Sequence, residues 1–90
     1  MSDLLYQTDP YFRLRLRWRS RRGLLENDLI LNRFLDRYEY DLTDADIVEL
    51  YKLLDLSDAD LIRLLLTDEL LKDDLYSPEM FRILKMLRNI

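Results

Sequence analysis

The feature that most constrains this chain is its shortage of turn-forming residues, with one glycine, Gly23, and two prolines among 90 residues. So little turn-forming material predicts few, long elements. Because glycine adopts positive φ at no steric cost, we expect Gly23 to be the left-handed residue that ends one helix before the next begins. By its position alone, Gly23 would be a helix cap and nothing more.

Four segments after Gly23 have the hydrophobic spacing or the start signals of helices. They are residues 24–40, 43–54, 57–66 and a last helix that begins at Ser77-Pro78-Glu79. Residues 1–9 are expected to be a flexible leader, and residues 67–76 a connection that could include a short helical turn. The apolar positions that repeat at helical spacing are Leu24, Leu31, Phe34, Leu35, Tyr38, Ile47, Leu50, Tyr51, Leu54, Leu61, Leu64, Leu65, Met80, Ile83, Leu84 and Leu87.

Residues 10–22 fit two patterns. Apolar residues alternate with arginines from Phe12 to Arg19, which is the period of a half-buried strand. A lone strand would leave its backbone groups unpaired, however, and nothing else in the chain has a strand pattern. We therefore predict a helix with Tyr11, Leu14 and Trp18 on its main apolar face and the remaining apolar residues on its flank. The fold class expected for the chain is an all-α single-domain bundle of about five helices.

Thr43 and Ser57 begin two similar stretches, each with an aspartate three residues later, Asp46 and Asp60. A hydroxyl followed at this spacing by an acid, before an apolar run, approximates a capping box. Calcium binding is the alternative, since several acids fall close together. An EF-hand loop needs glycine at its sixth position and glutamate at its twelfth, and neither stretch has them. Helix capping is therefore the favoured interpretation, and we expect no metal site.

The composition argues against an enzyme. The chain has no cysteine and no histidine, which excludes disulfides, thiolate and imidazole catalysis and most transition-metal sites. One glycine cannot make a glycine-rich phosphate loop. A chain of this length also has a modest core, so an enclosed active site is not expected. We predict no catalytic residues and no stably bound cofactor.

The sequence shows no targeting signal. No apolar run reaches the length of a transmembrane helix, and the first residues, Met-Ser-Asp-Leu-Leu, lack a signal or transit pattern. We expect a monomer that works in the cytoplasm and has no membrane partner.

Charge is unevenly distributed. Residues 11–22 carry six arginines and no acid, whereas residues 23–90 carry eight basic and sixteen acidic residues. This predicts one positive face on a negative body. Arginines interleaved with aromatic residues could bind nucleic acid by tracking phosphates and stacking bases. The acidic body would repel a polyanion, so nucleic acid is the second choice behind a protein partner.

The stretch Arg22-Gly23-Leu24-Leu25-Glu26, followed by Asp28 and an apolar helix, resembles the RGxxE signature of the SdhE/Sdh5 family. The resemblance runs from about residue 13 to residue 66 and includes the arginine-rich segment with Trp18. Members of that family are small helical assembly factors for the flavoprotein of succinate dehydrogenase. The resemblance implies that this chain binds that flavoprotein subunit, or that of fumarate reductase, and promotes its covalent attachment of FAD.

On this resemblance the FAD belongs to the partner, which links it to its own histidine. Arg22 would pair a partner carboxylate or polar rim, Gly23 would permit close backbone approach, and Glu26 would fix the turn or meet a partner cation. The other partner-binding residues would be Asp28, Arg17, Trp18 and Arg21. The alternative is a nucleic-acid-binding or antitoxin-like regulator that uses the arginine-rich first helix.

Overall fold

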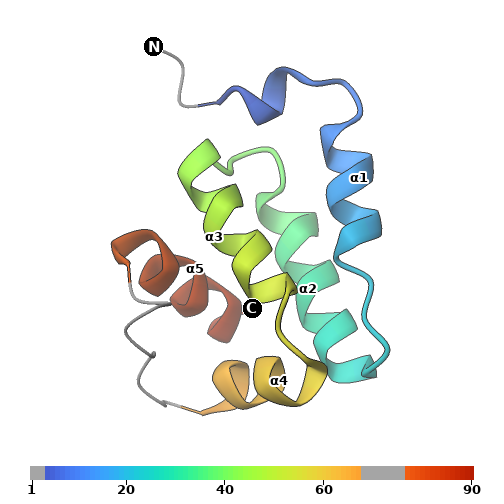
Figure 1. The fold of residues 1–90 in the computed structure, drawn as a ribbon, viewed down its shortest axis with the longest axis vertical. Helices are drawn as coiled ribbons and strands as arrows, with labels where there is room; N and C mark the ends of the chain where they lie inside the picture. Colours follow the sequence, from blue (N-terminus) through green and yellow to red (C-terminus); the bar gives the residue numbers. More distant parts are fainter. Residues whose placement is uncertain (1–3, 68–76) are drawn as a thin grey trace.

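The computed structural model describes residues 4–67 and 77–90, which form helices joined by turns with no strand among them (Figure 1). The elements are η1, a 3₁₀ helix (Tyr6–Thr8), and the helices α1 (Phe12–Arg19), α2 (Leu25–Tyr38), α3 (Asp44–Leu54), α4 (Asp58–Leu66) and α5 (Pro78–Arg88). The predicted all-α bundle of about five helices is confirmed. Apart from Thr67, the predicted connection over residues 67–76 lies outside the described residues.

Helix α5 packs against α2, α3 and α4 and completes the core. Its predicted stripe of Met80, Ile83, Leu84 and Leu87 is buried, as expected. Figure 1 shows α1 and α2 side by side along one edge, with α5 on the other side of α3. The remaining buried apolar side chains are Phe12, Leu16, Leu31, Phe34, Leu35, Leu42, Ile47, Leu50, Leu53, Leu54, Leu61 and Leu65.

The cap predicted at Thr43 is a complete capping box. The Thr43 hydroxyl oxygen accepts from the Asp46 N–H at 3.2 Å, and the Asp46 carboxylate accepts from the Thr43 N–H at 3.0 Å. Two of the N–H groups that a helix start leaves unpaired are thereby satisfied. Asp46 is 1% exposed and also forms an ion pair with Arg82 on α5. The box therefore joins the start of α3 to the last helix.

Ser57 and Ser77 are also N-caps, which confirms the other two predicted helix starts with a hydroxyl. Ser57 accepts from the Asp60 N–H at 3.2 Å and Ser77 from the Met80 N–H at 2.9 Å. The box at Ser57 is incomplete, because the Asp60 carboxylate lies 3.7 Å from Arg63 instead. Among residues 4–67 and 77–90, no three acidic side chains converge in a way that could hold a metal ion.

Residues 10–22 contain the predicted helix, but its predicted buried face is wrong. Phe12 and Leu16 are buried, whereas Tyr11, Leu14 and Trp18 are 64%, 70% and 72% exposed. Phe12 and Leu16 lie one turn apart and therefore fall on one face of α1. Ser20 continues that line one turn later and is also buried, with its hydroxyl donating to the Leu16 carbonyl at 2.7 Å.

The conformation predicted for Gly23 is also wrong. No described residue has positive φ, Gly23 included. Helix α1 already ends at Arg19, and residues 20–24 then cross to α2 as a non-helical segment. The change of direction is spread over this segment, so no single residue needs the left-handed conformation.

Residues 4–9 differ from the flexible leader that we expected. The N–H groups of Leu5 and Tyr6 donate to the Asp44 carboxylate at 3.0 and 2.9 Å. The Gln7 side chain donates to the Glu39 carbonyl at 2.7 Å. Since Asp44 is the first residue of α3, η1 is attached directly to the start of that helix.

Candidate functional site

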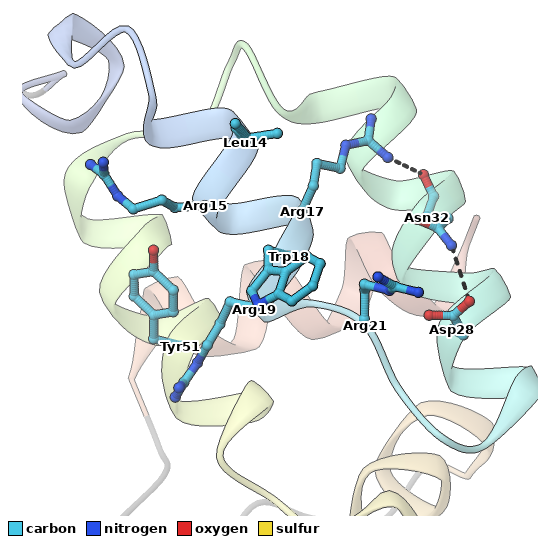
Figure 2. Close-up of a pocket in the computed structure, with 9 residues that line it drawn as sticks. All are labelled: Leu14, Arg15, Arg17, Trp18, Arg19, Arg21, Asp28, Asn32 and Tyr51. Carbon is cyan, nitrogen blue, oxygen red and sulfur yellow. Dashed lines mark hydrogen bonds between the residues drawn. The ribbon is translucent and has the colours of Figure 1, made fainter.

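An open groove of about 1100 Å³ lies along the outer face of α1 (Figure 2). Its lining comes from α1, from the segment after it, from α2 and from α3. Trp18, the residue predicted to be buried on the main face of α1, stands in the middle of this surface. The lining residues are Leu14, Arg15, Arg17, Trp18, Arg19, Arg21, Asp28, Asn32 and Tyr51. Four of the seven predicted partner-binding residues therefore share one groove.

Most arginines of the predicted positive face are paired within the chain. Arg15 pairs with Asp9 and Arg19 with Asp55. Arg17 reaches from α1 to the far end of α2, where it pairs with two acids, Asp36 and Glu39. These pairs cancel much of the positive potential expected of residues 11–22.

Among Arg15, Arg17 and Arg19, Arg17 has the least exposed side chain. It donates to Glu39 and to Asp36, each at 2.8 Å, and its own side chain is 28% exposed. Its hydrogen bond with Glu39 is the main cause that raises the pKa of Arg17. Arg17 lines the groove but is committed to holding α1 against α2.

Arg21 differs from its neighbours because it has no carboxylate partner among the described residues. Its guanidinium lies over the Trp18 ring, 5.1 Å from the ring centroid. A cation stacked on an exposed indole combines charge with a large apolar surface. Trp18 and Arg21 are therefore the part of the groove with unused binding capacity.

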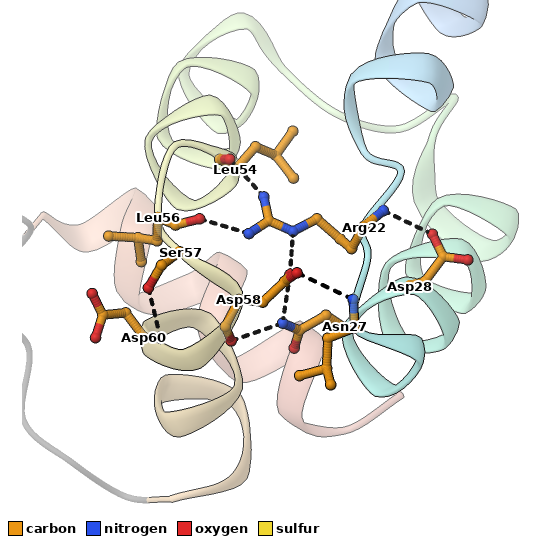
Figure 3. A network of polar contacts seen from close by, with 9 residues as sticks. Arg22, Asn27, Asp28, Leu54, Leu56, Ser57, Asp58 and Asp60 are labelled. Carbon is orange, nitrogen blue, oxygen red and sulfur yellow. Dashed lines mark hydrogen bonds and ion pairs between the residues drawn. The ribbon is translucent and has the colours of Figure 1, made fainter.

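Arg22 faces the inside of the molecule (Figure 3). Its side chain is only 11% exposed, and its Nε donates to Asp58 Oδ1 at 2.7 Å. The two terminal nitrogens donate to the carbonyls of Leu54 and Leu56, at 2.7 and 2.6 Å. Those carbonyls lie at and just beyond the end of α3, where the helix leaves acceptors unpaired and a cation is favoured. The first residue of the RGxxE motif is thus an internal contact.

Asp58 and Asn27 belong to the same network, and neither was predicted from the sequence as a site residue. Asn27 is fully buried, and its side-chain amide donates to the Asp58 carbonyl at 2.9 Å and to Asp58 Oδ1 at 3.1 Å. The hydrogen bonds from Arg22, and then those from Asn27, lower the pKa of Asp58. A polar Asn27 on the buried side of an apolar helix was the available signal, since buried amides need partners.

The exposed residues of the motif are Gly23, Leu25 and Glu26. Neither the Gly23 backbone nor the Glu26 carboxylate makes a hydrogen bond or ion pair with another described residue. Asp28, by contrast, accepts from the Arg22 N–H at 3.1 Å and from the Asn32 amide at 3.3 Å. Within the motif, the arginine is therefore an internal contact, whereas the glycine and the glutamate are exposed.

Comparison with known proteins identifies the family. The model of the Sdh5 family, described as the flavinator of succinate dehydrogenase, matches residues 14–89. The chain belongs to the Sdh5 family. The matched range includes the whole groove, the RGxxE turn and Asp58. The family resemblance inferred from the motif is thereby confirmed.

Two relatives support the same assignment. An FAD assembly factor SdhE from Ralstonia nicotianae is 46% identical over 89 residues, covering 99% of this chain and 94% of the relative. An FAD assembly factor SdhE from Shewanella oneidensis is 35% identical over 74 residues, covering 82% of this chain and 85% of the relative. No solved structure matches the chain. In the part of the chain that the structure describes, no helix is long and apolar enough to span a membrane.

Proposed function

We propose that this chain is a non-enzymatic assembly factor that binds the flavoprotein subunit of succinate dehydrogenase and promotes covalent FAD attachment to it. Membership of the Sdh5 family and the names of both relatives support this function. Binding to the flavoprotein subunit of fumarate reductase, the second partner named above, stays a prediction.

The observation that carries a docking role is the unused binding capacity around α1 and the turn. Trp18 is 72% exposed and has Arg21 stacked on it. Exposed tryptophan and arginine are the residues that most often dominate the energy of protein interfaces. Arg21 would meet a carboxylate on the partner, and Trp18 an adjacent apolar surface. The exposed backbone of Gly23, which has no side chain, would let a partner backbone approach the turn.

The chain would act on the flavoprotein by binding alone. It has neither cysteine nor histidine to offer as a nucleophile, and FAD would be bound and linked by the partner. A binding protein can still promote such a reaction if it binds the reactive conformation of its partner more tightly than other conformations. FAD attachment would then increase because that conformation is more populated.

Nucleic-acid binding, the alternative function, is less well supported than the sequence suggested. Arg15, Arg17, Arg19 and Arg22 are all paired with acids of the same chain. An arginine that is already paired contributes less to phosphate binding. An antitoxin-like role would again be protein binding and would use the same surface.

Reconstitution tests the proposal. The purified apo flavoprotein subunit is incubated with FAD, with and without this chain, and covalent flavin is measured by its fluorescence on a denaturing gel. We expect the chain to increase the rate of attachment and to co-purify with the subunit. Equal attachment with and without the chain, together with no co-purification, would contradict the proposed function.

A further inference from the structure

We propose that Asp58, on α4, is a positioning residue that holds the RGxxE turn in its docking conformation. This inference rests on the proposed function, which it deepens by assigning a role to a residue outside the motif. It also changes the role of Arg22, which would act through Asp58 instead of contacting the partner.

Three donors converge on the Asp58 carboxylate from the turn and from α2. Arg22 Nε and the Asn27 amide donate to Oδ1 at 2.7 and 3.1 Å, and the Leu24 N–H donates to Oδ2 at 3.1 Å. Arg22 and Leu24 flank Gly23 on both sides, so one carboxylate anchors both neighbours of the glycine. Figure 3 shows the contact between Arg22 and Asp58. Gly23 itself is exposed between these two anchored neighbours.

The position of Asp58 favours these hydrogen bonds energetically. Asp58 is the first residue of α4, where the helix favours a negative charge. Its side chain is 33% exposed, whereas that of Arg22 is 11% exposed. A partly buried, charge-assisted hydrogen bond is stronger than an ion pair on the open surface. The hydrogen bonds to the Asp58 carboxylate, which we call the clamp, therefore restrict residues 22–24, which lie outside any helix.

Replacing Asp58 with asparagine removes the clamp selectively. The amide has one oxygen, so it cannot accept from both Arg22 and Leu24, and its NH₂ group would face a donor. Asp60→Asn is the matched control. Asp60 lies in the same first turn of α4 and carries the same charge, but its carboxylate is near Arg63 and not near Arg22.

Amide hydrogen exchange tests the clamp without any partner. We expect Asp58→Asn to accelerate exchange at the Leu24 amide by roughly tenfold or more, and Asp60→Asn to leave it unchanged. Thr43→Ala removes the cap of α3 and so serves as a variant of lowered stability with an intact clamp. It should leave the Leu24 amide less affected than Asp58→Asn does. Unchanged Leu24 exchange in a folded Asp58→Asn protein would overturn the proposal.

Binding to the apo flavoprotein subunit, in a double-mutant cycle, tests the role in docking. Asp58→Asn and Arg22→Gln should each weaken binding by roughly tenfold, and the double variant should be no weaker than either alone. Fully additive losses would mean that Arg22 contacts the partner directly, and would overturn the proposal. If the unaltered protein fails to bind, the proposed function is wrong, whereas Leu24 exchange still decides whether Asp58 holds the turn.

Discussion

Arg17 on α1 and Glu39 at the end of α2 form a hydrogen-bonded ion pair of 2.8 Å, in which Glu39 is 14% exposed. Removing Arg17 would leave a mostly buried carboxylate without its cation. We predict that Arg17→Ala lowers the free energy of unfolding by about 1–3 kcal/mol, the usual range for a lost charged hydrogen bond. Urea denaturation measures this loss. Arg15→Ala is the control, because Arg15 is 61% exposed and should cost less. Equal losses would contradict the prediction.

Thr43→Ala should destabilise the protein by about 1 kcal/mol, because it removes one half of the capping box. Thermal unfolding monitored by circular dichroism checks the change. Millimolar calcium should not raise the melting temperature of the unaltered protein. A large rise would contradict capping as the role of this segment, since a ligand that binds only the folded state stabilises it.

Gly23→Ala should fold normally and bind its partner poorly. A Cβ at this position would lie 3.6 Å from Asp58 Oδ2, which is an ordinary contact, and the backbone has no positive φ to strain. The melting temperature should therefore stay the same or rise slightly, since alanine restricts the unfolded chain more than glycine does. The methyl group would nonetheless obstruct a partner backbone at the exposed turn. Full flavin attachment with this variant would show that Gly23 has no part in docking.

The stability contributed by Asp58 should be lost in acid. Its pKa in the folded protein lies below the ordinary value of 3.8, because Arg22 and Asn27 donate to the charged form. A depressed pKa contributes stability that is fully present above the unfolded value and is lost as the pH falls through the folded value. The stability difference between the unaltered protein and Asp58→Asn should thus be constant near neutral pH and shrink below about pH 4. Unfolding free energies measured across this range check it, and a difference independent of pH would contradict it.

The helices could be predicted from the sequence because their signals are local. The capping box at Thr43 depends on residues three positions apart, and the stripe from Met80 to Leu87 depends on the period of a single helix. Both lie within a few turns of the chain, so no knowledge of the tertiary fold is needed to identify them.

The buried face of α1 could not be predicted in this way. Tyr11, Leu14 and Trp18 fit helical spacing, and so do Phe12 and Leu16. Because arginines alternate with apolar residues along this helix, its two faces carry apolar residues to a similar degree. Packing against the rest of the bundle decides between them, and it buries Phe12 and Leu16. The resulting exposure of Trp18 is what makes it a candidate for docking.

The turn was mispredicted for a related reason. The conformation around Gly23 depends on Arg22 and Asp58, which are 36 residues apart in the chain. Local rules assign a lone glycine after a helix to the left-handed region. They contain nothing about a distant carboxylate that anchors the residues on both sides of it.

The most direct test of the account is the affinity of this chain for the apo flavoprotein subunit when Trp18 is replaced by alanine. Tyr40→Ala is the matched control, because Tyr40 is also exposed, at 67%, and also has an arginine over its ring, Arg13 at 4.3 Å, yet it lies outside the groove. Calorimetric titration should show that Trp18→Ala weakens binding by about 30-fold, as expected for the loss of an interface hot spot. Tyr40→Ala should bind as the unaltered protein does. Unchanged affinity of a folded Trp18→Ala variant would contradict docking through the groove on α1.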